Sequence, residues 1–332
     1  MKRILLIDYL RGISIFTIVV MHLCQKHTAG ALHNAFAFGG AGVHVFILCS
    51  GFGLYLSHLH KPLSYVDFLK RRFARVYVPY AIAVVLWVLW LLASTGVFHW
   101  REAASHLLLY KMFSTEYDTS LCYPYWFIST IIQFYLFWPL IVKLVQLKIG
   151  GGIALTISLL WGTLVGALGY TELRPWGSFF LQYLWEFCLG MWIAANFSSY
   201  IREQGGVPGW TDVKTWKWWW LIAGAVGGMG LSALMAWNGG FLKLYNDIPS
   251  LVGYLSVMLL IYKVGMKVVN RFFVWASGFG YELYLVHSLV FAIMAFCLKD
   301  ILPIYGLIAL SLIAAYVAGY CYSWLLVKVR LK

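Results

Sequence analysis

Residues 4–24 read ILLIDYLRGISIFTIVVMHLC, and this stretch indicates the class of the protein. It is long enough to cross a bilayer as one helix, because about 20 residues at about 1.5 Å each span about 30 Å of hydrocarbon. Three ionisable side chains interrupt it, namely Asp8, Arg11 and His22. Such groups are expensive inside a membrane, so each must face protein or water rather than lipid. The stretch predicts a first transmembrane helix with a polar stripe.

The whole chain has the composition of a polytopic membrane protein. Of its 332 residues, 62% are hydrophobic and 11% are charged, whereas soluble domains carry about 25% charged residues. The mean hydropathy is +0.79. These values exclude a disordered chain, a collagen-like chain and a typical cytosolic enzyme. The 17 tryptophans suit a protein that is anchored at two membrane–water interfaces.

Ten apolar runs predict ten transmembrane helices. They lie near residues 4–24, 37–58, 76–98, 124–146, 151–170, 176–197, 216–237, 246–268, 272–296 and 302–327. Ten spans of about 20 residues use most of the chain, so we expect one all-helical membrane domain over 1–332 without a separate soluble domain. Charges interrupt the first run and no small-residue cleavage site follows it, so we expect it to be retained.

The distribution of basic residues predicts the orientation. With both termini in the cytoplasm, 18 Lys and Arg residues fall in inside segments and 6 in outside segments, in agreement with the positive-inside rule. The net charge of +13 is explained in the same way, so we expect membrane lipids and no nucleic acid as partners. In the outside loop 99–123, we expect an interfacial helix from Ala103 to Phe113.

The cysteines predict no disulfide framework, and no pattern predicts a metal site. They show no paired spacing and mostly lie in apolar runs, which is typical of small buried residues. The six are Cys24, Cys49, Cys122, Cys188, Cys297 and Cys321.

Arg11 and His22 lie on one face of the predicted first helix. Eleven residues at about 100° each return to within about 20° of the same direction, roughly 16 Å further along the axis. Asp8 lies one turn before Arg11 and is a candidate counter-charge. A buried neutral imidazole can take a proton from an alcohol that attacks a thioester. His22 is therefore a candidate general base or acyl carrier, and the alternative is a structural histidine beside a structural ion pair.

A basic segment precedes the third run. It contains Lys70, Arg71, Arg72 and Arg75. Arg72 and Arg75 are one helical turn apart and can point at one anion, and guanidinium groups match phosphate oxygens. The alternative is a basic flank that only follows the positive-inside rule.

Several segments in this order and spacing are shared with a known family. They are Arg11 and His22 separated by ten residues, Ser50-Gly51-Phe52 after Phe46, Arg72-Phe73-Ala74-Arg75 before Pro79, Trp126 to Ser129 before Phe134-Tyr135, Glu186 before Phe187 and Gly190, and Tyr281 to His287. Over nearly its whole length, the chain resembles the membrane-bound acyltransferases of the acyltransferase-three type.

The resemblance implies transfer of an acyl group, usually acetyl, from cytoplasmic acyl-CoA to a hydroxyl of a surface polysaccharide or lipid-linked glycan. It makes His22 and Arg11 the catalytic pair, supported by Asp8, and places Arg72 and Arg75 at the phosphates of acetyl-CoA, with Arg71 and Lys70 beside them. It implies a multi-pass protein of the cell membrane, with the bacterial cytoplasmic membrane as the expected location. A homo-oligomer or a separate partner protein would fit.

Five further residues are candidate supporting groups: Ser50, Trp126, Glu186, Tyr284 and His287. Tyr284 and His287 are three residues apart and can share a helix face. The alternative for Glu186 is a hydrogen bond inside the helix bundle, and the alternative for Ser50 is close packing of a small residue. We interpret His44 as structural.

The chain also departs from the family pattern. Many relatives carry a glutamate pair where Ile131 and Ile132 stand here, which indicates different handling of the acceptor. Two other classes of function fit the sequence. A glycan transporter or flippase would also have ten spans and charges in the membrane, and a regulatory membrane module would bind acyl-CoA without turnover.

Overall fold

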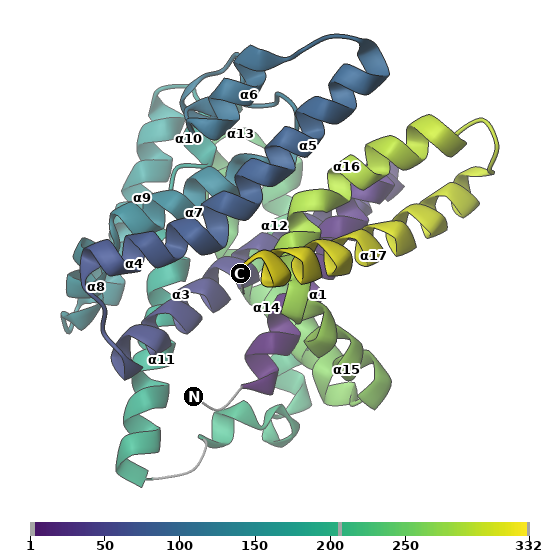
Figure 1. Cartoon of the computed structure of the whole chain (residues 1–332). Helices are drawn as coiled ribbons and strands as arrows, with labels where there is room; N and C mark the ends of the chain where they lie inside the picture. Colours follow the sequence, from purple (N-terminus) through teal and green to yellow (C-terminus); the bar gives the residue numbers. More distant parts are fainter. Residues whose placement is uncertain (1–3, 205–207, 331–332) are drawn as a thin grey trace. The chain divides into compact units, whose positions relative to one another are not determined.

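The computed structural model describes residues 4–204 and 208–330, and every regular element in these ranges is a helix (Figure 1). Eight helical segments of the described chain are long and apolar enough to cross a membrane, or nine if Tyr123–Leu136 and Trp138–Gln146 form one broken span. The all-helical membrane fold is thus confirmed, with a number of spans close to the expected ten. The predicted run 176–197 overlaps a 21-residue helix, Leu184–Gln204, which is not among the eight.

The orientation of the termini stays a prediction. Part of the charge count behind it falls on Lys2, Arg3 and Lys332, which lie outside the described residues.

The chain folds as two compact units, each built from three separate segments. Unit 1 comprises Met1–Ser14, Ala41–Tyr65 and Leu136–Gly278, and unit 2 comprises Ile15–Gly40, Val66–Tyr135 and Phe279–Lys332. Helix α1 (Leu5–Gln25) contributes its first turns to unit 1 and its remaining turns to unit 2. The expected single domain over 1–332 stays a prediction.

Unit 1 contains more of the described helices than unit 2. They are α3 (Gly42–His60), α8 (Trp138–Gln146), α9 (Gly150–Ala167), α10 (Arg174–Gly177), α11 (Leu184–Gln204), α12 (Trp218–Asn238), α13 (Gly240–Lys243), α14 (Asp247–Val264) and α15 (Lys267–Ala276).

Helices α3 and α11 cross with their backbones in contact. A Cβ atom at Gly51 would overlap the carbonyl oxygen of Phe187, and one at Gly190 would overlap the carbonyl oxygen of Leu48. Glycines at a helix crossing allow this close approach. In lipid there is no hydrophobic driving force between helices, so the van der Waals contacts of this approach stabilise their association. The crossing fixes α3 against α11.

Unit 2 is formed mainly by α2 (Gly30–Ala37), α4 (Tyr65–Arg72), α5 (Val78–Thr95), α6 (Trp100–Leu107), α7 (Trp126–Leu136), α16 (Gly280–Leu298) and α17 (Ile304–Arg330). Helices α16 and α17 form a hairpin near the yellow end of the colour bar (Figure 1). They approach closely where Gly319 faces the backbone of Leu283. Helix α5 has Pro79 in its first turn and ends at the left-handed Gly96, as helix capping rules predict.

The expected interfacial helix from Ala103 to Phe113 is broken in the structure. Helix α6 ends at Leu107, and a short 3₁₀ turn follows at Lys111–Phe113. Leu109 between them has a φ of 62°, a left-handed conformation that ends an α-helix.

We predict that Gly51→Ala destabilises the protein and Gly53→Ala does not. The new methyl group at position 51 meets the backbone of α11, and overpacking of this kind costs about 1–3 kcal/mol. Position 53 has open space within 4 Å, so alanine there should be neutral or raise stability by about 0.5–1 kcal/mol. Denaturant unfolding of the purified variants in detergent measures both effects, and equal stabilities would contradict the close crossing.

Candidate functional site

Two histidines face each other in unit 2. His22 lies in the last turns of α1, and His287 lies in the middle of α16. Their rings are stacked with centroids 5.1 Å apart and an interplanar angle of 14°. The Nδ1 atom of His22 is 2.9 Å from the Nε2 atom of His287. His287 is fully buried, whereas His22 retains partial exposure. The structure thus joins two residues that the sequence singled out separately.

The hydrogen bonds of His287 assign the protons of both rings. Its Nδ1 atom lies 2.7 Å from the carbonyl oxygen of Tyr284. A carbonyl only accepts, so Nδ1 carries the proton and Nε2 of the neutral ring accepts. His22 then donates from its own Nδ1 to that Nε2 atom. The hydroxyl of Ser288 lies 3.0 Å from the same Nε2 atom and shares the one lone pair of that nitrogen with His22. In this tautomer the lone pair of the His22 ring lies on Nε2.

Aromatic residues around position 125 hold α16 in place. The hydroxyl of Tyr284 donates to the carbonyl of Pro124, and the hydroxyl of Tyr125 donates to the carbonyl of Leu285 at 2.6 Å. Trp126 begins α7 and packs edge-on against Phe127, whose ring in turn packs against Tyr284. These contacts fix the backbone carbonyl that sets the tautomer of His287.

A buried histidine in the loop 99–123 supports the same region. His106 accepts at Nδ1 from the hydroxyl of Tyr80 at 3.1 Å and donates from Nε2 to the carbonyl of Ser120 at 3.0 Å. Burial and the positive charge of Lys111 lower the pKa of His106 to about 3, so the ring is neutral near pH 7. Its ring packs against Tyr125. His106 was not among the residues that the sequence singled out.

In unit 1, Arg11 is directed toward α3. Its guanidinium lies over the ring of Phe46, 5.6 Å from the centroid. The charges of Arg11 and Asp8 both act on the thiol of Cys49 in α3. The Nε atom of Arg11 is buried and has no hydrogen-bond partner among the described residues. Arg11 therefore faces protein, as the cost of a charge in lipid requires.

The basic segment has an unusual backbone. Helix α4 ends at Arg72, and residues Phe73–Tyr77 form a π-helical turn. Such turns are frequent at functional sites. Arg72 packs over the rings of Phe68 and Tyr135, at 5.5 and 6.0 Å.

The other basic residues of this segment, Lys70, Arg71 and Arg75, are exposed. A shared anion site at Arg72 and Arg75 stays a prediction.

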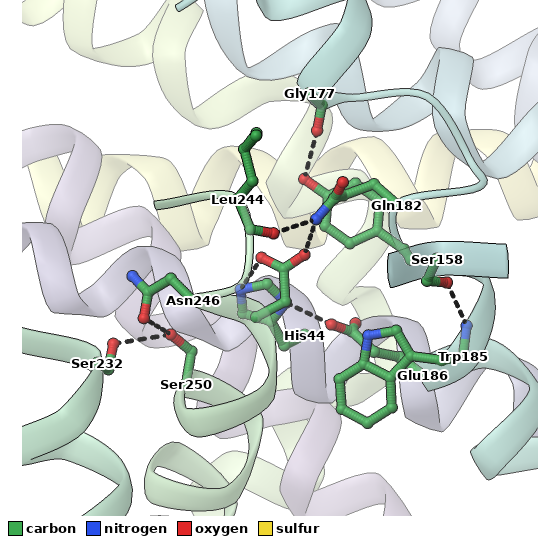
Figure 2. Close-up of polar contacts among 12 residues, drawn as sticks. His44, Ser158, Gly177, Gln182, Trp185, Glu186, Ser232, Leu244, Asn246 and Ser250 are labelled. Carbon is green, nitrogen blue, oxygen red and sulfur yellow. Dashed lines mark hydrogen bonds and ion pairs between the residues drawn. The ribbon is translucent and has the colours of Figure 1, made fainter. Parts of the chain in front are cut away.

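A polar cluster in unit 1 joins three helices (Figure 2). It consists of His44, Gln182, Glu186 and Asp247, and we call it the His44 cluster. Nδ1 of His44 is 2.7 Å from an oxygen of Glu186, and Nε2 is 3.7 Å from an oxygen of Asp247. The sequence interpretation treated His44 as structural and did not connect it with Glu186 or Asp247.

Ser50 makes a local contact. Its hydroxyl donates to the carbonyl of Phe46 at 2.8 Å, within α3. The bond is local to α3, and the role of Ser50 as a supporting group stays a prediction.

Residues 4–327 match a family model described as an acyltransferase domain, of the acyltransferase-three type. The match covers nearly the whole chain and confirms the resemblance seen in the sequence. No curated protein and no solved structure matches the chain.

We predict that His106 makes the protein sensitive to acid. Its folded pKa of about 3 lies below the ordinary value of about 6.5, so the unfolded chain binds the proton first. The stabilisation is complete above about pH 6.5 and is lost as the pH falls toward 3. Between pH 7 and pH 5 this amounts to about 2 kcal/mol, because one pKa unit corresponds to about 1.4 kcal/mol.

Denaturant unfolding at several pH values measures this loss. His106→Gln should remove this part of the pH dependence, whereas the exposed His60→Gln should retain it. An identical pH dependence in the wild type and His106→Gln would refute the assignment.

Proposed function

Because the chain belongs to the membrane-bound acyltransferase-three family, we propose that it transfers an acetyl group from acetyl-CoA to a hydroxyl of a cell-envelope carbohydrate. The observation that carries the proposal is the His22–His287 pair, since its hydrogen bonds place the proton of the neutral His22 ring on Nδ1 and the lone pair on Nε2. A lone pair on a partly exposed imidazole is what a general base for an alcohol needs.

The reaction follows from this tautomer. Nε2 of His22 takes the proton of the acceptor hydroxyl while its oxygen attacks the thioester carbonyl carbon. The new C–O bond forms, the C–S bond breaks, and the leaving CoA thiolate takes the proton back from His22. During the step His22 is an imidazolium, and its Nδ1–H still donates to Nε2 of His287. His287 therefore orients the base and stabilises its charged form.

Arg11 serves a different part of the substrate in this proposal. It lies eleven residues before His22 on α1, roughly 16 Å away along the helix axis. The two side chains are too far apart to contact one carbonyl group. The buried Nε atom of Arg11 lacks a hydrogen-bond partner in the described chain and is available as a donor to the extended arm of acyl-CoA. Asp8, one turn earlier, balances the charge of Arg11.

The basic segment supplies the contacts to the CoA phosphates. Arg75, Arg71 and Lys70 are exposed and can reach a ligand, and the π-helical turn places Arg75 away from a regular α-helical position. Arg72 is held by aromatic rings and adds its charge from a fixed position. In the proposed orientation this segment faces the cytoplasm, where acyl-CoA is found, and His22 lies toward the outer end of α1.

This arrangement defines the expected setting. The protein acts in the cell membrane, with the bacterial cytoplasmic membrane as the proposed location. A donor from inside and an acceptor from outside meet near His22. The membrane domain works as a homo-oligomer or with a separate partner protein that handles the glycan.

The direct test is acetyl transfer by the purified full chain. Protein in nanodiscs is given labelled acetyl-CoA and a panel of envelope glycans, and transfer is followed by mass spectrometry. We expect transfer by the wild type, loss of at least about 100-fold with His22→Ala, and full activity with the exposed His60→Ala. Glycan transport without acyl transfer would support a transporter, and acyl-CoA binding without turnover would support a regulatory module. Either result would contradict the proposal.

The same preparation separates the two roles of His22. Incubation with labelled acetyl-CoA and no acceptor leaves the protein unlabelled if His22 is only a base. A label on His22 would instead show that the acetyl group passes through Nε2.

We predict that His287 affects the rate more than the binding of substrate. His287→Leu removes the acceptor for Nδ1–H of His22, so kcat should fall by about 100-fold while KM for acetyl-CoA changes little. His287→Gln keeps an acceptor near the same place and should restore about a tenth or more of the rate. Steady-state kinetics of both variants gives the result. Equal losses with Leu and Gln would indicate that His287 only fills space.

A further inference from the structure

The His44 cluster takes no part in the chemistry proposed for His22, yet its ionisable members come from three different helices and contact one another. His44 lies in the first turn of α3, Glu186 in the first turn of α11, and Asp247 begins α14. Figure 2 shows the side chains of His44 and Glu186 meeting, with Gln182, which precedes α11, beside them. The cluster is thus a joint between three helices of unit 1.

The hydrogen bonds of the cluster are unequally shared between the two carboxyl groups. Gln182 donates from Nε2 to Asp247 at 2.6 Å and to the carbonyl of Leu244 at 2.7 Å. The positive charge of Arg174 also acts on Asp247. Asp247 therefore has a donor and a cation of its own. Among the described residues, His44 is the one hydrogen-bond partner of the Glu186 carboxyl group.

Within residues 4–204 and 208–330, the neighbours of Glu186 supply no further cation or donor to it. Ser158 of α9 bonds the carbonyl of Leu181 and the backbone N–H of Trp185 instead. The ring of Tyr183 lies 6.0 Å from that of His44, and its hydroxyl donates to the carbonyl of Gly177. On α14, Ser250 bonds within a separate group with Asn246 and Ser232.

The second carboxyl oxygen of Glu186 is left unpartnered. Glu186 is 0% exposed, and its Oε2 atom has no hydrogen-bond partner in the described part of the chain. The Oε1 atom of Gln182 is also buried and has no hydrogen-bond partner in the described part of the chain. A full negative charge on a buried carboxylate that has one imidazole as its hydrogen-bond partner, and none at its second oxygen, costs several kcal/mol, which protonation avoids. The described chain shows no group of side chains arranged for a metal ion that could supply the missing charge.

We propose that the His44 cluster is a proton-binding site, in which Glu186 holds a proton at neutral pH. The 2.7 Å contact between Glu186 and His44 is then a bond between a neutral acid and a neutral base. Oε1–H of Glu186 donates to Nδ1 of His44, and Nε2–H of His44 points to Asp247. Asp247 carries the one negative charge, compensated by Arg174. The proton comes from water and returns to water, so no other reactant is needed.

The proton matters because Glu186 lies close to the point where α3 and α11 are packed against each other. Their backbones touch at Gly51 and Gly190, within two turns of the cluster. Loss of the proton places an uncompensated carboxylate between two helices that are in direct contact. We therefore expect the joint to loosen in alkali, with a lower unfolding temperature above the pH at which Glu186 ionises.

Infrared spectroscopy detects this proton directly. A protonated carboxyl shows a C=O stretch that a carboxylate lacks, and ¹³C-labelled glutamate distinguishes Glu186 from Asp247 by a shift of the band. We expect the acid band in the wild type at pH 7, its loss in Glu186→Gln, and its retention in Glu172→Gln. Glu172 is the matched control, since it is 72% exposed and forms a surface ion pair with Lys243.

A titration of the wild type keeps the test independent of how the variants fold. Raising the pH should convert the labelled acid band into a carboxylate band and lower the unfolding temperature over the same range. The proposal is overturned if the wild type shows no acid band at pH 7, if the band follows labelled aspartate instead of glutamate, or if it persists in Glu186→Gln.

Discussion

The chemistry proposed for this protein depends on one hydrogen bond, between Nδ1 of His22 and Nε2 of His287. Its direction is set by the backbone carbonyl of Tyr284, which accepts from the other nitrogen of His287. A carbonyl cannot change its protonation state, so the tautomer is fixed by the fold and not by the surroundings. A carboxylate in that position would bring a second charge into the membrane. A neutral histidine in that position orients the base at a lower free-energy cost, because the bundle is mostly apolar.

The helices were predictable because membrane thickness and charge spacing determine them, but the pairing of side chains was not. The run 4–24 became α1 almost unchanged. The spacing of Tyr284 and His287 predicted a shared face, and the structure uses the backbone carbonyl of Tyr284 while its hydroxyl holds Pro124. The contact between His22 and His287 joins residues 265 positions apart, and no local pattern contains that information.

The contacts that the sequence did not predict have physical causes as well. His44 looked like a lone histidine because its partners come from α11 and α14. A partial signal was present, since the runs that contain His44, Glu186 and Asp247 all begin on one side in the predicted topology, but Glu186 lay ten residues into its predicted run, whereas α11 begins only at Leu184. For Arg72 and Arg75, a common target stays a prediction, although the regular α-helical spacing behind it is replaced by a π-helical turn from Phe73 to Tyr77. In the loop 99–123, an interfacial helix was expected to continue to Phe113, yet α6 ends at Leu107 and Lys111 is 0% exposed.

The segments that identify the family contain two kinds of residue. Arg11 and His22 carry polar groups that the membrane tolerates only for a purpose. Gly12 and Gly51 carry none, and each lies where a Cβ atom would overlap the backbone of another helix, at Phe273 and Phe187 respectively. The glycine next to Arg11 brings α1 close to α15, so it helps to determine where the arginine points. The glycines at the helix contacts therefore help to position the reactive side chains beside them. A side chain in an apolar bundle is positioned only by the helices that surround it.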